Sequence, residues 1–184
     1  FIDPDTHEVV ASFTAEGQIV VIGAGPIQTP LLLQKSGLGQ QSGMVGRNLS
    51  VRPGVSVFGK FPEPVYGWRG ALTGIHVDEF WKEKYNWIDM DSGLAAPAQL
   101  ISQGELGEGD DHVRFMKEYK YFSALNVFVH DHGQGYVQWI GDAVTGDKRI
   151  EWNLNRDEFN SMREGLRHAG RVMFAAGAEK VYLP

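Results

Sequence analysis

The sequence has 184 residues, of which 42% are hydrophobic, and it contains no Cys. This length and hydrophobic content predict a globular chain with a substantial core. Its 17 basic residues are outnumbered by 23 acidic ones, and the two signs are interspersed, so we expect no nucleic-acid partner. The lack of Cys excludes disulfides, thiolate catalysis and Cys-ligated metals, and no apolar run is long enough to predict a membrane span.

The first elements in chain order are two strands and a short helix. Apolar residues predict strands at 8–13 and 18–22. A helix is expected over 29–35, because Thr29-Pro30 is typical of a helix start and Gly37 of a helix end. The Gly-, Gln- and Ser-rich stretch 39–48 is interpreted as a loop.

The remaining elements are mostly strands, followed by one long helix. Asn155 is the expected N-cap of that helix, apolar residues recur at spacings of three and four after it, and Gly177 ends it. Shorter helices are expected at 97–103 and 110–119. The expected strands are 50–60 with an interruption at Pro53-Gly54, 72–77, 87–91, 122–130, 136–140 and 149–154.

This order predicts an α+β fold. We expect a mixed or antiparallel sheet of about five or six strands, with helices segregated to one side of it, and a β-β-α piece at the front. Because strands and helices do not alternate regularly, a repeating βαβ arrangement is not favoured.

The stretch IVVIGAG at 19–25 looks like the beginning of a dinucleotide-binding turn. That turn needs a third glycine where the helix packs on the strand, and this sequence has Gln28 there. It also needs an acidic residue about twenty positions later, and none occurs around 42–46. The sequence therefore does not favour such a turn.

A longer stretch explains these residues better. The fifteen positions 25–39, GPIQTPLLLQKSGLG, closely resemble the second signature of the glucose-methanol-choline (GMC) oxidoreductases, which bind FAD. Three further stretches resemble family segments in the same order: VGRNL at 45–49, the residues 131–137 with 150–157, and the helix end at 172–178. The resemblance spans nearly the whole chain.

The resemblance implies two parts: a strip of the FAD-binding domain at 1–49, to which the β-β-α piece belongs, and a portion of the substrate-binding domain at 50–184. Family members also carry a glycine-rich FAD turn well before this signature and a His-containing catalytic segment after it, and neither is in these residues. We therefore expect the chain to correspond to the middle of an enzyme, to contain no catalytic residue, and to be inactive without the remaining parts.

The resemblance also implies which residues lie beside FAD. Gly23, Ala24, Gly25 and Pro26, expected at the end of a buried strand, would lie beside its ADP part, and their small side chains would let the main chain approach a cofactor. The alternative is a tight turn that only packs. Arg47 and Asn48 are candidate residues at the cofactor's edge, with a solvated loop as the alternative. Arg52 stands where relatives often have His, so no role of that His is carried over.

Aromatic residues are dense after position 65. Trp68, Phe80, Trp81 and Trp87 are candidates for the wall of a substrate pocket, although aromatic side chains in a sheet layer more often belong to a core. His130 and His132 are two apart on an expected strand and would face the same side. We interpret them as surface residues, and we predict no metal site.

The function implied by the resemblance is FAD-dependent oxidation of a CH–OH group in a sugar, a sterol or a long-chain alcohol. The cofactor would accept a hydride, while the protein would hold the substrate in position. Two alternatives remain open at this point. One is a stand-alone binding domain without catalysis, and the other is a lyase with the GMC fold.

Overall fold

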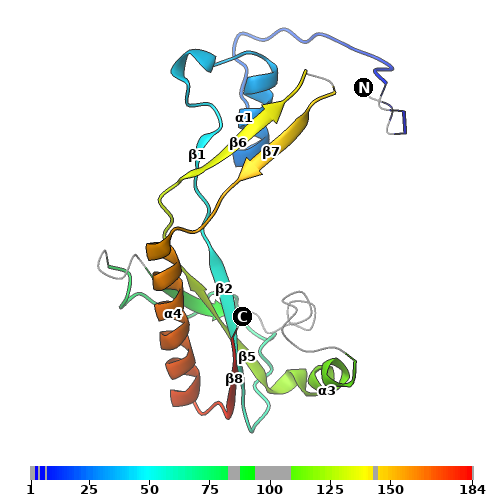
Figure 1. Ribbon diagram of the computed structural model, residues 1–184. Helices are drawn as coiled ribbons and strands as arrows, with labels where there is room; N and C mark the ends of the chain where they lie inside the picture. The colour runs from blue at the N-terminus through cyan, green and yellow to red at the C-terminus, as the bar shows by residue number, and fades with distance from the viewer. Residues whose placement is uncertain are drawn as a thin grey trace. The chain divides into compact units, whose positions relative to one another are not determined.

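A computed structural model describes residues 3, 5, 6, 8–82, 88–93, 109–142 and 145–183. The chain forms two compact units, one made of Phe1–Gly46 with Val137–Arg149 and the other of Arg47–Tyr136 with Ile150–Pro184. Figure 1 shows the helices and strands of both. The expected helix 97–103 lies outside the described residues.

The first unit contains the helix α1 (Gly25–Lys35). It begins four residues before the predicted start, because Pro26 fits a first turn, where a missing N–H costs no hydrogen bond. Pro30 consequently lies inside the helix. The end agrees with the prediction: Gly37 has φ +66°, and the Leu38 N–H donates to the Leu33 carbonyl at 2.9 Å.

The two strands predicted before α1 are not formed. Residues 8–13 and 18–22 contain no strand apart from an isolated bridge at Val9. Ile19, Val20 and Val21 are between 78% and 87% exposed. Apolar alternation favours a strand only when a neighbouring strand supplies hydrogen bonds and burial, and the side chains of Ile19, Val20 and Val21 lack that burial.

Gln34 joins α1 to the strand β6 (Gly135–Ile140), whose residues 137–140 belong to the first unit. Its Nε2 donates to the carbonyls of Val137 at 2.9 Å and Val45 at 3.2 Å, and its Oε1 accepts from the Trp139 N–H at 2.6 Å. Gly46, with φ +84°, lies so close to the Val137 carbonyl that a Cβ would overlap it. The main chain around 45–46 is therefore fixed against α1 and β6.

The strands form two sheets instead of the single one expected. A five-stranded antiparallel sheet has the order β3 (His76–Val77), β4 (Asp89–Gly93), β5 (Phe122–Phe128), β2 (Gly54–Lys60) and β8 (Lys180–Tyr182). A three-stranded sheet has the order β1 (Arg47–Leu49), β6 and β7 (Asp147–Glu151). The predicted α+β class is confirmed. The strands β1 and β8 were not expected from the sequence, because each has only three residues and depends on distant partners.

The long helix α4 (Arg156–Ala175) packs on one face of the five-stranded sheet (Figure 1). Asn155 caps it as predicted, in a capping box with Glu158. Met162, Ala169 and Met173 meet residues from β2, β4 and β5 such as Val57, Met90 and Val127 in the main core cluster. The apolar stripe expected from the sequence is therefore buried at Met162, Ala169 and Met173, whereas Phe159 at its start is 58% exposed.

The helix α3 (Asp110–Glu118) packs on the opposite face, followed by the short 3-10 turn η3 (Tyr119–Tyr121). Phe115 joins Phe58 and Phe122 in a second cluster, and these two sheet residues alternate with the strand positions that face α4. The structure thus differs from the expectation of helices on one side. The reason is that β5 is apolar on both faces at its start, so both faces require cover.

One 3-10 turn, η1 (Gln40–Ser42), lies between α1 and β1. Within the part of the chain that the structure describes, no helix is long and apolar enough to cross a membrane.

Candidate functional site

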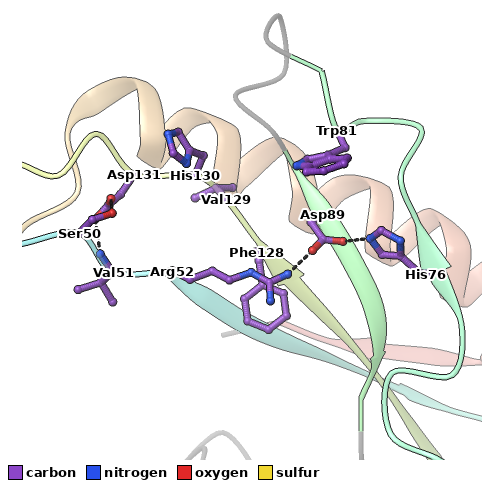
Figure 2. Close-up of a pocket in the computed structure, with 10 residues that line it drawn as sticks. All are labelled: Ser50, Val51, Arg52, His76, Trp81, Asp89, Phe128, Val129, His130 and Asp131. Atoms are coloured by element: carbon purple, nitrogen blue, oxygen red, sulfur yellow. Dashed lines mark hydrogen bonds and ion pairs between the residues drawn. The ribbon is translucent and has the colours of Figure 1, made fainter. Parts of the chain in front are cut away.

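A pocket of about 730 Å³ opens at one end of the five-stranded sheet, within the second unit. Register places Asp89 and Gly54 opposite Phe128, so the start of β4, the end of β5 and the segment before β2 meet there. Figure 2 shows the ten lining residues, which are Ser50, Val51, Arg52, His76, Trp81, Asp89, Phe128, Val129, His130 and Asp131.

Asp89 holds two basic side chains of this pocket. One carboxylate oxygen accepts a hydrogen bond from Arg52 Nη2, and the other contacts His76 Nε2 (Figure 2). The guanidinium group of Arg52 also lies 4.0 Å from the centre of the Phe128 ring. Asp89 is 17% exposed while its two partners are about half exposed, so the acid orients groups that solvent or a ligand can reach.

The contact of His76 with Asp89 fixes which ring nitrogen carries the hydrogen in the neutral imidazole. With Nε2–H donating to the carboxylate, Nδ1 is left as an acceptor. An acceptor of this kind can receive the hydrogen of a hydroxyl group, and Arg52 offers further N–H donors. The polar end of the pocket is therefore suited to an oxygen-bearing group, between the aromatic side chains of Trp81 and Phe128.

Asp131 is the most buried charged group of the pocket, with 3% of its surface exposed. It accepts hydrogen bonds from the Ser50 hydroxyl, the Val51 N–H at 2.7 Å, the Trp152 indole at 2.6 Å and the Gly133 N–H at 3.1 Å. Burial alone would raise its pKa, but these donors together hold the pKa below its ordinary value of 3.8. The group is therefore an ionised structural acid that shapes the pocket.

A second buried acid, Glu158, lies at the start of α4 with 2% of its surface exposed. Its carboxylate accepts from the His132 N–H at 2.9 Å, from His132 Nδ1 at 2.8 Å and from the Asn155 N–H at 2.8 Å. Burial opposes ionisation, but the hydrogen bonds from Asn155 and His132 outweigh it and lower the pKa of Glu158. Glu158 therefore links His132, which follows β5, to the first turn of α4.

Gly23, Ala24, Gly25 and Pro26 form the exposed N-terminal turn of α1 and not the end of a buried strand. The reason is that residues 18–22, which precede this turn, form no strand in the part of the chain that the structure describes. Ala24 occupies the N-cap and gives no side-chain hydrogen bond, so the first N–H groups of α1 are uncapped. A Cβ at Gly23 or Gly25 would meet nothing within 4 Å. This open main chain fits an anionic group such as the diphosphate of FAD.

Arg47 and Asn48 belong to the other unit, where they are exposed in β1. Asn48 has φ +59°, a left-handed conformation that Asn tolerates better than most residues. The structure therefore describes the two groups of expected cofactor residues separately, and the assignment of all six to FAD stays a prediction.

The four aromatic candidates are dispersed. Trp81 lines the pocket, whereas Phe80 stacks on His168 with ring centres 3.9 Å apart and packs against the main core. Trp68 packs on Tyr119 with ring centres 4.7 Å apart. Trp87 lies outside the described residues. Their assignment to a substrate pocket also stays a prediction. Among the described candidates, Trp81 is the one that lines the pocket of about 730 Å³, which is called the polar pocket below.

His130 and His132 have ring centres 5.7 Å apart, and both are exposed. His130 lines the pocket, while His132 pairs with Glu158. Within residues 3–183, gaps excepted, no group of three or more His, Cys, Asp or Glu is arranged to hold a metal ion.

The acidic residues Asp89 and Asp131 of the pocket, and Asp91 beside it in β4, were not expected from the sequence. Asp89 and Asp91 are separated by one residue, Met90. In a strand, this spacing places both carboxylates on the same face. Asp91 is satisfied by Asn126 Nδ2 at 2.9 Å, and Asn126 Oδ1 in turn accepts from the Ser56 hydroxyl at 2.7 Å. The spacing of Asp89 and Asp91 could have indicated two acids on one strand face, whereas nothing in the sequence linked Asp131 to Ser50 or Trp152.

Comparisons with known proteins agree with this picture. Residues 3–54 match the family model described as GMC oxidoreductase. An uncharacterized GMC-type oxidoreductase of Mycobacterium tuberculosis is 32% identical over 162 residues, which are 88% of this chain and 24% of that protein. The long-chain-alcohol oxidases FAO4B and FAO4A of Arabidopsis thaliana are 28% and 24% identical, over 92% of this chain and 22% and 23% of their own lengths. The chain spans about a quarter of the length of these relatives.

Proposed function

Because the chain belongs to the GMC oxidoreductase family, we propose that it forms part of an FAD-dependent enzyme that oxidises a CH–OH group. Residues 1–49 would contribute to the FAD-binding domain and residues 50–184 to the substrate-binding domain. The observation that carries the proposal is the family match over 3–54, which includes a helix N-terminus that is open to an anionic group.

FAD would supply the acceptor for the hydride that leaves the alcohol carbon. On this chain, the N-terminal turn of α1 would hold the diphosphate through its uncapped N–H groups, helped by the helix dipole. Gly23 and Gly25 would keep the approach to the main chain open. Arg47 and Asn48 are proposed to line another edge of the cofactor.

The polar pocket is proposed to hold the alcohol end of the substrate. His76 would accept the hydroxyl hydrogen at Nδ1, since Asp89 occupies Nε2. Arg52 would donate to the substrate oxygen, while Trp81 and Phe128 would flank the carbon next to it and exclude water. Two of the relatives are long-chain-alcohol oxidases, which supports an alcohol as the substrate.

The test begins with the absorbance of the protein, purified in its complete natural form. We expect the near-ultraviolet and blue bands of bound flavin, and bleaching of the blue band when an alcohol is added without oxygen. A protein that binds no FAD after reconstitution would contradict the proposal and favour a binding domain. Bound flavin with product formation but without bleaching would favour a lyase.

Two variants connect the test to this chain. Gly23→Val should weaken FAD binding at least about tenfold without a change in the melting temperature of the flavin-free protein, because the new side chain fills open space. Gly170→Val is the control, since a Cβ there also meets nothing within 4 Å. His76→Ala should raise KM for the alcohol, whereas His112→Ala in α3 should not.

A further inference from the structure

A second pocket of about 580 Å³ lies within the same unit, between α4 and the segment that leads into β2. This volume is typical of a site for a small molecule. Most of its lining is apolar and comes from the segment 51–55 and from side chains of α4 such as Phe159 and Leu166. Its two charged side chains, Arg52 and Arg163, are both basic, and none of the described residues that line it is acidic.

The two guanidinium groups of this second pocket differ in what they already bind. Arg52 donates from Nη2 to the Asp89 carboxylate, and its guanidinium lies over the Phe128 ring. Arg163 makes only a long contact, 3.5 Å from its Nη2 to Asn160 Oδ1, and pairs with no acid among the described residues. A guanidinium has five N–H donors in a planar fork, so Arg163 can still hold a carboxylate through two of them.

The register of α4 explains why Arg163 has no acidic partner on its own helix. Its neighbours at three and four positions are not acidic, and they are Phe159, Asn160, Leu166 and Arg167. Arg167, by contrast, pairs with Glu164 three positions before it, at 3.0 Å. Phe159 and Leu166 also line the second pocket. On the helix surface, Arg163 therefore stands between an aromatic and an aliphatic residue of the pocket wall.

This arrangement favours a ligand that has an apolar body and one carboxylate. A body packed on the apolar lining would exclude water from the neighbouring guanidinium, and a charge pair is stronger where water is excluded. A neutral polar ligand would form only uncharged acceptor contacts with Arg163, which are weaker than charge-assisted ones, and a cation would be repelled. Since the chain has a net charge of −6, an anion needs a local excess of basic groups, and this pocket provides one.

We propose that the second pocket is a binding site for a small carboxylate with an apolar body. Arg163 would hold the carboxylate, while Phe159 and Leu166 would pack against the body. Of the described residues that line this pocket, only Val51 and Arg52 also line the polar pocket. The site is therefore distinct from the one proposed for the alcohol, and the inference does not depend on the proposed function.

Calorimetry with the complete natural protein tests this site. The probes are 3-phenylpropionate, its neutral analogue 3-phenylpropanamide, and acetate, which has the charge without the apolar body. Arg163→Gln removes the guanidinium, and Arg167→Gln is the matched control, because Arg167 is exposed on the same helix and does not line the pocket. Both side chains are exposed, so both variants should keep the melting temperature of the wild type. His76→Ala reports whether the probe binds in the polar pocket instead.

We expect 3-phenylpropionate to bind at least about tenfold more tightly than the amide or acetate. Arg163→Gln should remove this advantage over the amide, while Arg167→Gln and His76→Ala should keep the wild-type affinity. The absence of binding, equal affinity for carboxylate and amide, or unchanged affinity in Arg163→Gln would overturn the proposal. A loss in His76→Ala alone would also overturn it, because the probe would then occupy the polar pocket. Since calorimetry needs no turnover, a protein that oxidises no alcohol would contradict the proposed function and still decide this site.

Discussion

The buried carboxylate of Asp131 accepts a hydrogen bond from the indole Nε1 of Trp152 at 2.6 Å. The same carboxylate oxygen accepts from the Val51 N–H, while the other oxygen binds the Ser50 hydroxyl. Asp131 and Ser50 line the pocket of about 730 Å³ described above, Trp152 lines a second pocket of about 580 Å³ in the same unit, and Val51 lines both. One acid therefore supports the walls of both pockets.

Replacing this acid should destabilise the protein and alter both pockets. Asp131→Asn keeps the shape of the side chain but replaces one carboxylate oxygen with an NH₂ group. This donor would face N–H or O–H groups that also donate, so these buried groups would lose their acceptor. We expect the free energy of unfolding to fall by about 2–4 kcal/mol, measured by urea denaturation. Asp147→Asn is the control, because Asp147 is exposed, and it should change stability by less than about 0.5 kcal/mol.

The lowered pKa of Glu158 predicts a pH dependence of stability. Its carboxylate is stabilised in the folded state, so its contribution is present above the ordinary value of 4.5 and is lost as the pH falls through the lower folded-state pKa. Urea denaturation of wild type and Glu158→Gln should therefore differ most at about pH 6 and converge toward about pH 3. Glu164→Gln, at a partly exposed site on α4, should track the wild type throughout. A constant difference for Glu158→Gln would contradict the prediction.

Gln34 should be essential for anchoring α1. Gln34→Ala removes the acceptor of the Trp139 N–H and the donor to two carbonyls, which we expect to destabilise the first unit by about 2 kcal/mol. Hydrogen exchange at the Trp139 amide measures this locally and should become roughly thirtyfold faster. Gln28→Ala, at an exposed site of the same helix, is the control and should leave that amide protected.

Gly46 should tolerate no side chain. Gly46→Ala adds a Cβ that overlaps the Val137 carbonyl at a residue with φ +84°, so we expect a loss of about 3 kcal/mol or more. Gly43→Ala separates strain from overlap, because Gly43 has φ +64° but open space around it, and it should cost about 1 kcal/mol. Exchange at the Val137 amide, which donates to the Gly46 carbonyl at 2.7 Å, reports the difference. Equal effects of the two variants would show that overlap is unimportant.

Elements governed by neighbouring residues could be predicted from the sequence. The start of α4 follows from Asn155 and Glu158, its buried stripe from the spacing of Met162, Ala169 and Met173, and the end of α1 from Gly37. The strands β2 and β5 follow from stretches rich in apolar residues. The resemblance over 25–39 indicates the family by itself, because a signature of fifteen positions is specific.

The candidate site depended on contacts that no local pattern encodes. Asp131 reaches Ser50 across 81 positions and Trp152 across 21, and Asp89 joins Arg52 and His76 from three separate segments. The strands predicted at 8–13 and 18–22 are not formed among the described residues, and sequence periodicity alone could not show this, because strand formation also depends on distant segments. Sequence thus determined the elements whose hydrogen bonds close within a few residues, and tertiary structure decided which distant polar groups meet, because only burial forces them to pair.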